Sequence, residues 1–436
     1  MKESKFNEYF LAPDGTKLAF NSYSCGLAIV DDSYERLLDL VKKNVSQDEI
    51  PDELRECYEA ACEGMFIVPD DKNEILDLLT KRNVQKYSLD SLGLTIAPTL
   101  ACNFKCLYCY ETSKPGVMGS ELTEKIVDFV KAQSDHLKNL SISWYGGEPL
   151  LAKKIVYSLS EQFLNICSEK GIQYNAFMIS NGSLLDDDTI SKLIEYKVTG
   201  IQITVDGPPA VHNSRRVSKN GRGTFDLIID NVNKLIDSGK IDVVLRINVD
   251  KSNDADVREL ISILAERLHS KLVKITFGQV TAYTETCRSI ENKCYDNGEF
   301  AVRLLHYYSV LQEYGFDECN KFPYPEAKVN YCCAELANSF VIDPEGYAYK
   351  CWNEVGNVKH SVGNIDNGTL DIAGYKNGQW LNRNPLLNGK CAKCSLVPIC
   401  MGGCPYNDIS LQKGNVCDLI KYNIREIMLK YYEMNR

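Results

Sequence analysis

A regular alternation of short apolar runs and amphipathic stretches occupies the middle of the chain and most restricts how it can fold. The apolar runs predict strands at 93–97, 141–145, 175–180, 201–205, 243–249 and 273–278. Helical periodicity between them predicts helices at 121–135, 152–168, 187–195, 224–238 and 255–268. Such repeats form a parallel sheet with right-handed crossovers, as an open sheet or part of a barrel. The expected fold class is α/β, with a partial TIM-like (βα)6 barrel.

The first 90 residues are expected to form a separate α+β module. Two strands flank a Pro-Asp-Gly turn at 13–15, residues 26–30 predict a third strand, and Asp31 suits a helix N-cap. A second helix, a short strand and a further helix are expected at about 52–63, at 65–68 and after residue 71. This order of elements is typical of a winged-helix-like module.

The last part of the chain lacks this regularity. Beyond about residue 320 the cysteines become dense and long apolar runs are few, until a final helix near 415–433. A segment of this kind often depends on metal for its fold. We therefore expect three domains, which are a winged-helix-like module at 1–90, the barrel at 91–315 and a cysteine-rich domain at 316–436.

The cysteine content is the unusual feature of the composition, with 18 in 436 residues. The N-terminal stretch has no apolar signal core, and no apolar run approaches the roughly 20 residues of a membrane span. We therefore expect a cytoplasmic protein with reduced thiols, where clustered cysteines favour metal binding over disulfides. A net charge of −10 without a basic stripe argues against a nucleic-acid partner, and no membrane partner is expected.

Three cysteines follow the first predicted barrel strand with the spacing C-x₃-C-x₂-C, at Cys102, Cys106 and Cys109. Three thiolates on one tight loop can bind three irons of a 4Fe–4S cube and leave the fourth iron open. An open iron can chelate the amino and carboxylate groups of a methionine moiety. Zinc would usually require four protein ligands, which this loop does not provide.

With the aromatic Tyr108 before its last cysteine, this segment resembles the radical S-adenosylmethionine (SAM) superfamily. The resemblance implies a 4Fe–4S cluster on the three cysteines and SAM as the second cofactor. It also implies reductive cleavage of the sulfonium to methionine and a 5′-deoxyadenosyl radical, which abstracts hydrogen from an unactivated carbon. The cofactors supply this chemistry, and the protein supplies position and the exclusion of water and oxygen.

The ends of the next two strands carry further candidate cofactor-binding residues. Gly146-Gly147-Glu148-Pro149 resembles the GGEP segment of the superfamily. Two glycines let backbone approach a ligand closely, and the Glu148 carboxylate can pair with an ammonium group, which the resemblance implies is the methionine amine. Ser180 and Asn181 offer polar groups for ribose or carboxylate contacts.

The fourth and fifth strands add a less specific set. Asp206-Gly207-Pro208 with His212, Arg215 and Arg216 looks like a further stretch of the same superfamily, which implies cofactor contacts for Asp206 and Arg215. His212 suits either a loop-stabilising hydrogen bond or a catalytic role. Arg246 is also expected to bind cofactor and shares one face of its strand with Asn248. That face either lines the interior of the barrel or carries a structural pairing.

A second cysteine set lies near the C-terminus. Gly346-x₄-Cys351, then Cys391-x₂-Cys394-x₅-Cys400-x₃-Cys404 and Cys417, resembles the seven-cysteine SPASM pattern of enzymes that modify peptides and proteins. The resemblance implies two auxiliary 4Fe–4S clusters, and hence three clusters in the chain. A zinc ribbon on the four cysteines from 391 to 404 is the main alternative.

The resemblance also assigns the ligands of these two clusters. One cluster takes all four ligands from Cys391, Cys394, Cys400 and Cys417. The other takes Cys333, Cys351 and Cys404, with Cys332 in place of Cys333 as an alternative. Its fourth ligand is open. Either Cys332 or Cys319 completes the set, or one iron stays free to bind a substrate thiolate.

Two peptide reactions compete within this group. Anaerobic sulfatase maturases carry an aspartate base after the cysteine that corresponds to Cys351, but Trp352 follows here, and they generally lack a separate N-terminal module. A maturase of ribosomally made peptides accounts for residues 1–90, which would bind a leader peptide by β-augmentation. We therefore expect an enzyme that forms a thioether or carbon–carbon cross-link in a precursor peptide.

Other functions stay open at this stage. A peptide epimerase is a third hypothesis for the enzyme's reaction. The hypotheses that involve no catalysis are an iron–sulfur electron carrier and a zinc-stabilised scaffold protein. The GGEP segment argues against the last two, because a carrier has no use for a methionine-binding loop. No catalytic residue is identifiable from the sequence. The expected partners are the precursor peptide and an electron donor such as flavodoxin or ferredoxin.

Overall fold

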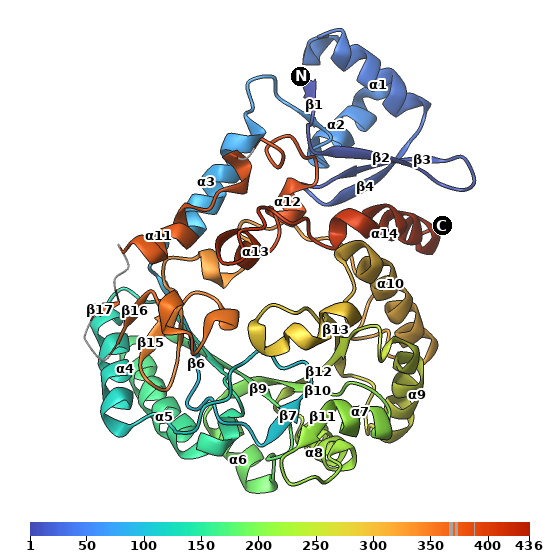
Figure 1. Ribbon diagram of the computed structural model, residues 1–436. Helices are drawn as coiled ribbons and strands as arrows, with labels where there is room; N and C mark the ends of the chain where they lie inside the picture. The colour runs from blue at the N-terminus through green and yellow to red at the C-terminus, as the bar shows by residue number, and fades with distance from the viewer. Residues whose placement is uncertain (366–368, 371–373, 388) are drawn as a thin grey trace. The chain divides into compact units, whose positions relative to one another are not determined.

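The computed structural model describes residues 1–365, 369–370, 374–387 and 389–436. The chain forms two compact units, each assembled from segments far apart in the sequence (Figure 1). We call them the barrel unit (Ser88–Phe322 and Cys333–Leu381) and the terminal unit (Met1–Tyr87, Pro323–Cys332 and Asn382–Arg436). Among the residues described, none of the helices has both the length and the apolar character to cross a membrane. The expected division into domains at 1–90, 91–315 and 316–436 stays a prediction.

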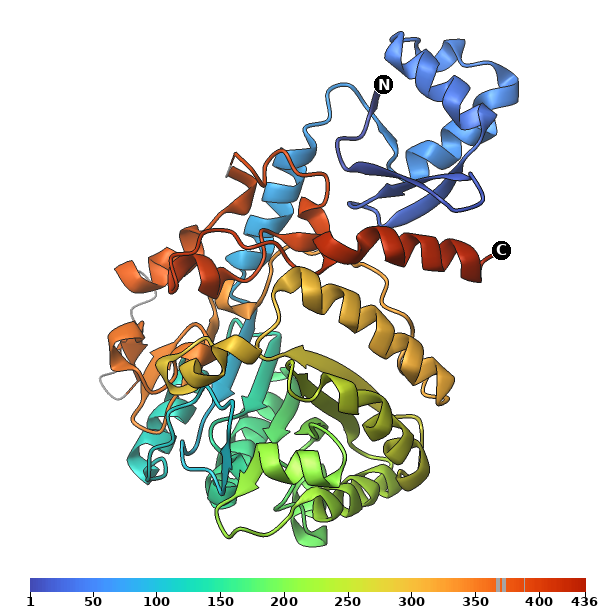
Figure 2. The same cartoon turned by 45° about the vertical axis from the view of Figure 1, so that its right-hand side comes forward.

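Six parallel strands form the centre of the barrel unit. In chain order they are β6 (Ser91–Ile96), β8 (Asn139–Trp144), β9 (Gln173–Ser180), β10 (Val198–Thr204), β12 (Asp242–Val249) and β13 (Lys274–Gln279), and each pairs with the next. Five helices connect them: α4 (Ser120–Gln133), α5 (Lys153–Lys170), α6 (Asp187–Glu195), α8 (Phe225–Ser238) and α9 (Val257–Arg267). The helices lie on the outer side of the sheet (Figures 1 and 2). The predicted α/β class with a parallel sheet is confirmed.

Alternation along the strands separates a packed outer face from an inner face that carries polar groups. On β12, Val243, Leu245 and Ile247 are buried, whereas Arg246 and Asn248 are half-buried and line a cavity inside the sheet. The buried residues face the helices because successive side chains point to opposite sides of a strand. The inner face is therefore the side of the sheet on which polar side chains are available for binding or catalysis.

The sheet continues past the expected end of the barrel. Strand β14 (Ser339–Ile342) adds to β6 in parallel, and β15 (Tyr347–Tyr349), β16 (Gly363–Asn364) and β17 (Thr369–Leu370) extend it antiparallel. The sequence pattern did not predict these short strands. It also missed α7 (Pro209–Arg215), α10 (Asn297–Glu313), α11 (Tyr375–Asn382) and the two-stranded sheet of β7 (Phe104–Cys106) with β11 (Arg216–Ser218).

The N-terminal part of the terminal unit has the expected order of elements. Strands β2 (Asn7–Leu11), β3 (Lys17–Asn21) and β4 (Gly26–Val30) form an antiparallel sheet, followed by α1 (Asp32–Lys42), α2 (Arg55–Glu63) and α3 (Glu74–Lys86). The short strands β1 (Lys2–Glu3) and β5 (Ile67–Val68) pair separately. Asp31 is the N-cap of α1 and accepts a hydrogen bond from the Tyr34 amide, as expected.

The C-terminal segments complete this unit. They contain α12 (Val397–Cys400), α13 (Pro405–Ile409) and α14 (Ile420–Met434). One core joins both ends of the chain, because Phe6 and Leu78 pack with Leu386, Val397 and Met401. The terminal unit is therefore a joint product of the two ends of the chain.

Short 3₁₀ turns occur between these elements. They are η1 (Gln47–Glu49), η2 (Asp52–Leu54), η3 (Pro149–Ala152), η4 (Asp254–Asp256), η5 (Glu285–Lys293), η6 (Cys333–Glu335), η7 (Trp352–Glu354), η8 (Val358–His360) and η9 (Pro385–Leu387).

Candidate active site and cluster sites

The three-cysteine loop follows β6 and is held by a short strand of its own. Strand β7 contains Cys106, which is paired with Arg216 on β11. Phe104 is buried beneath the loop, and the Arg216 guanidinium lies 5.6 Å from the centre of its ring. The loop is thus fixed by sheet pairing and by an arginine–aromatic contact, in addition to any metal it holds.

All three cysteines line one cavity of about 630 Å³ on the inner side of the barrel sheet. Burial raises the pKa of Cys102 to about 11 and that of Cys109 to about 12, and it also raises the pKa of Cys106. Metal binding must therefore displace protons from these thiols. The predicted cofactor residues that line the same cavity are Gly146, Gly147, Ser180, Asn181 and Arg246.

The two glycines of the GGEP segment pack against the approach to the cysteine loop. A Cβ on Gly146, whose φ is +110°, would lie 2.3 Å from the Thr99 carbonyl oxygen. A Cβ on Gly147 would lie 2.4 Å from the Ala101 carbonyl oxygen. Real Cβ atoms are excluded at such distances, so the glycines permit close approach of backbone to backbone. The sequence argument had assigned that freedom to contact with a ligand.

Glu148 is turned away from the cavity and onto its own chain. Its carboxylate is fully buried and accepts hydrogen bonds from the Ser180 hydroxyl (2.9 Å), the Asn181 amide (2.7 Å) and the Leu150 amide (3.1 Å). Burial raises its pKa. Pro149, also buried, begins η3. Glu148 therefore positions the two polar residues at the end of β9, and its pairing with a methionine amine stays a prediction.

Asn181 links the end of β9 to the cysteine loop. Its Nδ2 donates to Asn103 Oδ1 at 2.7 Å and lies 4.0 Å from the Cys102 sulfur. The Asn103 amide nitrogen in turn donates to the Ser183 hydroxyl at 2.9 Å. This chain of polar contacts fixes the first cysteine relative to the second and third strands of the barrel.

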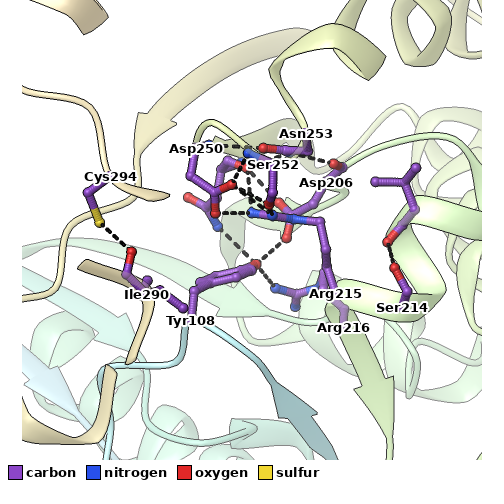
Figure 3. A network of polar contacts seen from close by, with 12 residues as sticks. Tyr108, Asp206, Ser214, Arg215, Arg216, Asp250, Ser252, Asn253, Ile290 and Cys294 are labelled. Atoms are coloured by element: carbon purple, nitrogen blue, oxygen red, sulfur yellow. Dashed lines mark hydrogen bonds and ion pairs between the residues drawn. The ribbon is translucent and has the colours of Figure 1, made fainter. Parts of the chain in front are cut away.

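Tyr108, the aromatic residue of the motif, is held by a buried polar network (Figure 3). Its hydroxyl donates to Asp206 and accepts from Arg216 Nη1 at 2.8 Å and from Asn248 Nδ2 at 3.3 Å. Asp206 also accepts from the Asn248 amide at 2.9 Å. Asp206 is fully buried and does not line the cavity. Its contacts therefore position Tyr108, and its predicted contact with a cofactor has no support in this geometry.

Arg215 belongs to the same network and also points away from the cavity. It forms a two-pronged ion pair with Asp250, with N–O distances of 3.1 and 2.9 Å, and donates to the Ser252 hydroxyl at 2.7 Å (Figure 3). Its guanidinium carbon lies 5.2 Å from the centre of the Tyr108 ring. A planar guanidinium suits both contacts. The neighbouring Arg216, rather than Arg215, lines the cavity.

The sequence allowed His212 either a loop-stabilising or a catalytic role, and the geometry supports the loop-stabilising one. It is fully buried, its Nδ1 lies 3.4 Å from the Asp206 amide nitrogen, and its Nε2 lies 3.3 Å from the Thr224 hydroxyl. Burial lowers its pKa to about 3. The imidazole is therefore neutral and holds the loop after β10 to the start of α8.

Arg246 faces the cavity, as the alternation on β12 predicted. Its Nε donates to Asn248 Oδ1 at 2.8 Å, so both predicted alternatives, the lumen and a structural pairing, occur together. A Cβ on Gly278 of β13 would lie 2.2 Å from Arg246 Nη2, so the glycine makes room for the guanidinium. Sequence reasoning missed Gln202 and Thr204 on β10, although these polar residues alternate with Ile201 and Ile203.

Aromatic residues line another part of the cavity. The Tyr145 ring packs against Trp352 with centroids 4.7 Å apart, and its hydroxyl lies 2.5 Å from that of Tyr110. Tyr145 also bonds to the carboxylate of Glu111, whose pKa burial raises to about 7. None of these residues was predicted as a site residue. They surround space next to the cysteine loop where a substrate side chain can be enclosed.

The second cysteine set has a cavity of its own in the terminal unit. Cys391, Cys394, Cys400 and Cys417 line one pocket of about 40 Å³, together with Leu396 and Val397. These are the four cysteines assigned to one auxiliary cluster. A mostly apolar space bordered by four thiols suits a fully ligated cluster.

Arg383 organises the backbone beside this pocket. The buried guanidinium donates to the carbonyl oxygens of Gly402 (2.8 Å) and Gly403 (3.1 Å) and to Asn415 Oδ1 (2.8 Å). Its own carbonyl accepts from Arg82 and Lys86 on α3, at 3.0 and 3.1 Å. The N-terminal module is therefore bonded directly to the segment that carries these cysteines.

The remaining candidate ligands are divided between the two units. Cys319, Cys333 and Cys351 belong to the barrel unit, and Cys332 and Cys404 to the terminal unit. Among the described residues, no three His, Cys, Asp or Glu side chains are placed to hold a single metal ion. This holds for all three proposed cluster sites, so the cluster on Cys333, Cys351 and Cys404 rests on the cysteine spacing and the other two on the spacing and on the pockets that their cysteines line.

The donor set of the main cavity fits the cofactors that the sequence implied. Three thiols, two close-packed glycines and polar side chains on β9, β10 and β12 border a single space. Cys102, Cys106 and Cys109 would hold the cluster, and Ser180, Asn181, Gln202, Thr204 and Arg246 would face SAM. When bound, this pair supplies one-electron cleavage of a sulfonium next to the substrate.

Comparison with known proteins agrees with this site. Residues 96–264 match the family model of the radical SAM superfamily. A serine-type anaerobic sulfatase-maturating enzyme of Klebsiella aerogenes is 24% identical over 73% of this chain and 80% of its own length. Native anSMEcpe with bound AdoMet and Cp18Cys peptide superposes with a TM-score of 0.62 at 20% identity, over 79% of this chain and 99% of that chain.

A second solved structure spans more of the chain. Streptococcus suis SuiB bound to the precursor peptide SuiA has a TM-score of 0.54 at 17% identity, over 94% of this chain and 96% of that chain. At such identities the likenesses to solved structures establish the fold. The matched family model, with the cysteine loop at the strand ends, shows that residues 96–264 form a radical SAM domain, and the curated relatives indicate that the chain is an enzyme.

Proposed function

We propose that this enzyme modifies a ribosomally made precursor peptide, forming a thioether or carbon–carbon cross-link after abstraction of a substrate hydrogen atom. The observation that carries the proposal is the terminal unit, where a three-stranded sheet with an open edge is built onto the segment that holds four cluster cysteines. A peptide-binding edge and an auxiliary cluster in one unit suit an enzyme whose substrate is a long peptide.

The extent of the likenesses supports this choice. SuiB, solved with a precursor peptide, matches 94% of this chain, whereas anSMEcpe matches 79%. About a fifth of this chain therefore has no counterpart in anSMEcpe, and most of that fifth has one in SuiB. We infer that the additional part includes the N-terminal module and that this module recognises a leader segment.

Strand β4 is the edge that suits a leader peptide. In the sheet order β2-β3-β4 it pairs with β3 on one side only. Its sequence is entirely apolar, and Ile29 is 56% exposed. An exposed apolar edge strand is a template for a further strand.

Ile29→Glu tests leader docking. A charge on the edge strand should weaken binding of the precursor peptide about tenfold or more, measured by fluorescence anisotropy, because it disfavours strand addition. Leu76→Glu on α3 is the matched control, because Leu76 is also 56% exposed in the same unit. Equal affinity of the two variants would exclude β4 as the docking edge.

Formylglycine formation, as in sulfatase maturases, is the second candidate. The higher TM-score of anSMEcpe favours it. Trp352 after Cys351 opposes it, because the resemblance places an aspartate base there and the indole packs on Tyr145 instead. Glu111, which lines the same cavity as Trp352, offers a carboxylate that could replace that base.

Mass spectrometry of the peptide separates these reactions. The enzyme is incubated without oxygen with SAM, dithionite and the peptide encoded beside its gene. A cross-link removes two hydrogens and leaves no aldehyde, whereas formylglycine reacts with a hydrazide probe. An epimerase leaves the mass unchanged in H₂O and introduces deuterium in D₂O. Absence of the two-hydrogen loss would exclude the cross-link.

The partition into three clusters is tested separately. The variant Cys102→Ala/Cys106→Ala/Cys109→Ala should release no 5′-deoxyadenosine and should retain about two thirds of the iron of the native enzyme, because one of three proposed clusters is lost. Loss of all the iron would contradict independent auxiliary clusters. Native iron near one cluster per chain would contradict the proposed count.

A further inference from the structure

The charged side chains that line the main cavity are mostly basic. In the described part of the chain they are Lys105, Glu111, Arg216, Lys219 and Arg246. Four cations therefore face one carboxylate, although the chain as a whole has a net charge of −10. A cleft lined by one sign of charge focuses the field and concentrates ligands of the opposite sign. The cavity thus favours an anionic occupant.

Three of these five groups are bonded to neighbouring side chains within the barrel unit. Arg216 donates to the Tyr108 hydroxyl at 2.8 Å, and Arg246 donates to Asn248 Oδ1 at 2.8 Å. The Glu111 carboxylate accepts a hydrogen bond from a tyrosine hydroxyl of the cavity wall. These contacts hold the three side chains in place and leave the two lysines to be explained.

Lys105 and Lys219 differ from these three groups in their surroundings. Both side chains are exposed, and neither lies within ion-pair distance of a carboxylate in the described part of the chain. A lysine ammonium has three donors and no acceptor, so its best partner is an anion. Two such groups at one cavity provide a place where a carboxylate can bind.

The two lysines lie on one face of the short sheet of β7 and β11 (Figure 1). Lys105 is directly opposite Val217, and the Lys219 amide donates to the Asn103 carbonyl at 2.8 Å, which continues the pairing. Lys105 and Lys219 are therefore diagonal neighbours. Such neighbours are about 7–8 Å apart on an antiparallel pair, within reach of long side chains. Both ammonium groups can thus meet at one carboxylate, and we call them the lysine pair.

The cofactors do not explain the lysine pair. SAM has a positive sulfonium, a positive ammonium and one carboxylate, so it is itself a net cation. Arg246 is available for that carboxylate, and Arg216, directly opposite Cys106 in the sheet, lies beside the thiols of the cysteine loop. The charge of Lys105 and Lys219 therefore suits a further, acidic occupant of the cavity.

We propose that the lysine pair binds an Asp or Glu side chain of the peptide substrate, close in sequence to the residue that loses hydrogen. The inference rests on the proposed function, because it assumes a peptide substrate, but it applies to any modification of that peptide. Charge pairs at the rim of a site give specificity and register more than affinity. The lysine pair would therefore select which residue of the peptide faces the cysteine loop.

Charge exchange between enzyme and peptide tests the proposal. The probe is the precursor peptide encoded beside the gene, with each Asp changed to Asn and each Glu to Gln in separate variants. One such change should lower kcat/KM for peptide modification about tenfold, and Lys219→Glu should do the same with the native peptide. Lysine in place of the sensitive acidic residue should restore most of the rate of the Lys219→Glu enzyme. Lys105 is left unchanged, because it lies between two cluster cysteines.

Arg222→Glu is the matched control. Arg222 is exposed, follows Lys219 closely in the sequence and does not line the cavity. This substitution changes the net charge by the same amount, but it should leave kcat/KM with the native peptide close to the native value. Lys219→Arg keeps the charge at the cavity and should retain most of the rate. The two comparisons separate the lysine pair from a general change in net charge.

Three results would overturn the inference. The first is native kcat/KM in the Lys219→Glu variant, or a peptide series with no sensitive acidic residue. The second is a KM for SAM that rises about as much as kcat/KM for the peptide falls, which would assign the lysine to the carboxylate of the cofactor. The third is a loss of rate only when the C-terminus of the peptide is amidated, which would assign the lysine to the end of the peptide.

A binding measurement separates this inference from the proposed function. Fluorescence anisotropy of the labelled precursor peptide, with holoenzyme and SAM but no reductant, should show about threefold weaker binding to the Lys219→Glu variant, restored by the charge exchange. A product other than a cross-link, with the charge exchange intact, contradicts the proposed reaction alone. A cross-link that forms without any dependence on the charge exchange contradicts the inference alone.

Discussion

Gly403 shows how a single residue controls the pocket of the second cysteine set. Its φ is +73°, and a Cβ there would lie 1.9 Å from the Val416 carbonyl oxygen. Gly414 has a similar φ of +69°, but a Cβ there would meet nothing within 4 Å. The two positions therefore separate backbone strain from steric exclusion within one segment.

We predict different outcomes for Gly403→Ala and Gly414→Ala. The second change should cost about 1–2 kcal/mol of unfolding free energy, from left-handed strain alone. The first must in addition move Val416 and Cys417, so the variant should lose about one cluster of iron per chain. Iron analysis and thermal denaturation measure both. Equal iron content in the two variants would show that Gly403 does not shape a cluster site.

His212 gives a prediction about pH. Burial lowers its pKa to about 3, while an unfolded histidine titrates near pH 6.5. Below about pH 6.5 the unfolded state binds a proton at His212 that the folded state does not bind. The free energy of unfolding therefore falls by up to about 1.4 kcal/mol for each unit by which the pH is lowered. His212→Gln should lower stability at pH 7.5 but flatten its decline between pH 6.5 and 5. The exposed His136, replaced in the same way, should keep the native slope in thermal melts.

At the scale of elements, α3 connects the N-terminal module to the C-terminal cysteine segment. Leu78 on α3 is 3% exposed and packs with Leu386, Val397 and Met401, while Arg82 and Lys86 bond to the Arg383 carbonyl. The helix is amphipathic, but its sequence does not reveal which distant segment covers its apolar face. That choice depends on residues about 300 positions away in the sequence.

Leu78→Ala should therefore affect a cluster that lies far away in sequence. The cavity it creates costs about 2–5 kcal/mol, and the loss falls on the core that supports Val397 and the following Cys400. We expect lower auxiliary iron and a lower melting temperature. Leu76→Ala, at an exposed position on the same helix, is the control. Unchanged iron in the Leu78 variant would contradict the shared core.

At the scale of the whole molecule, the terminal unit takes residues from both ends of the chain. Deletion of 1–87 should therefore do more than abolish the proposed leader binding. Its loss exposes Leu386, Val397 and Met401, and we expect the remainder to lose the cluster on Cys391, Cys394, Cys400 and Cys417. Iron and sulfide analysis of residues 88–436 would measure this. Retention of native iron would show that the C-terminal segment folds without the N-terminal module.

The sequence predicted the regular elements well where structure is local. Helix α6 has the predicted bounds, and the six barrel strands differ from the predicted ranges by at most three residues. Strand and helix periods are visible within a few turns of chain, so they can be read without tertiary information. Strands β14 to β17 were missed because they have only two to four residues, too few to show a period.

The candidate site was also predicted only in part, because only some of its features depend on local sequence pattern. The cysteines, Gly146, Gly147, Ser180, Asn181 and Arg246 line one cavity, because parallel strands bring their carboxyl ends to one edge. Glu148, Asp206 and Arg215 lie close in sequence to these residues, but they point away from the cavity and hold other residues in place. Nothing in a motif distinguishes a side chain that faces a ligand from one that faces its own chain.

By itself the sequence determined the superfamily, the order of strands and the cysteine spacing, because each depends on neighbours within a few residues. Tertiary structure alone decided two further points. It turned Glu148 inward, and it joined the two ends of the chain around Leu78 and Val397. Those outcomes depend on contacts between distant segments, where packing and burial rather than local pattern select the partner.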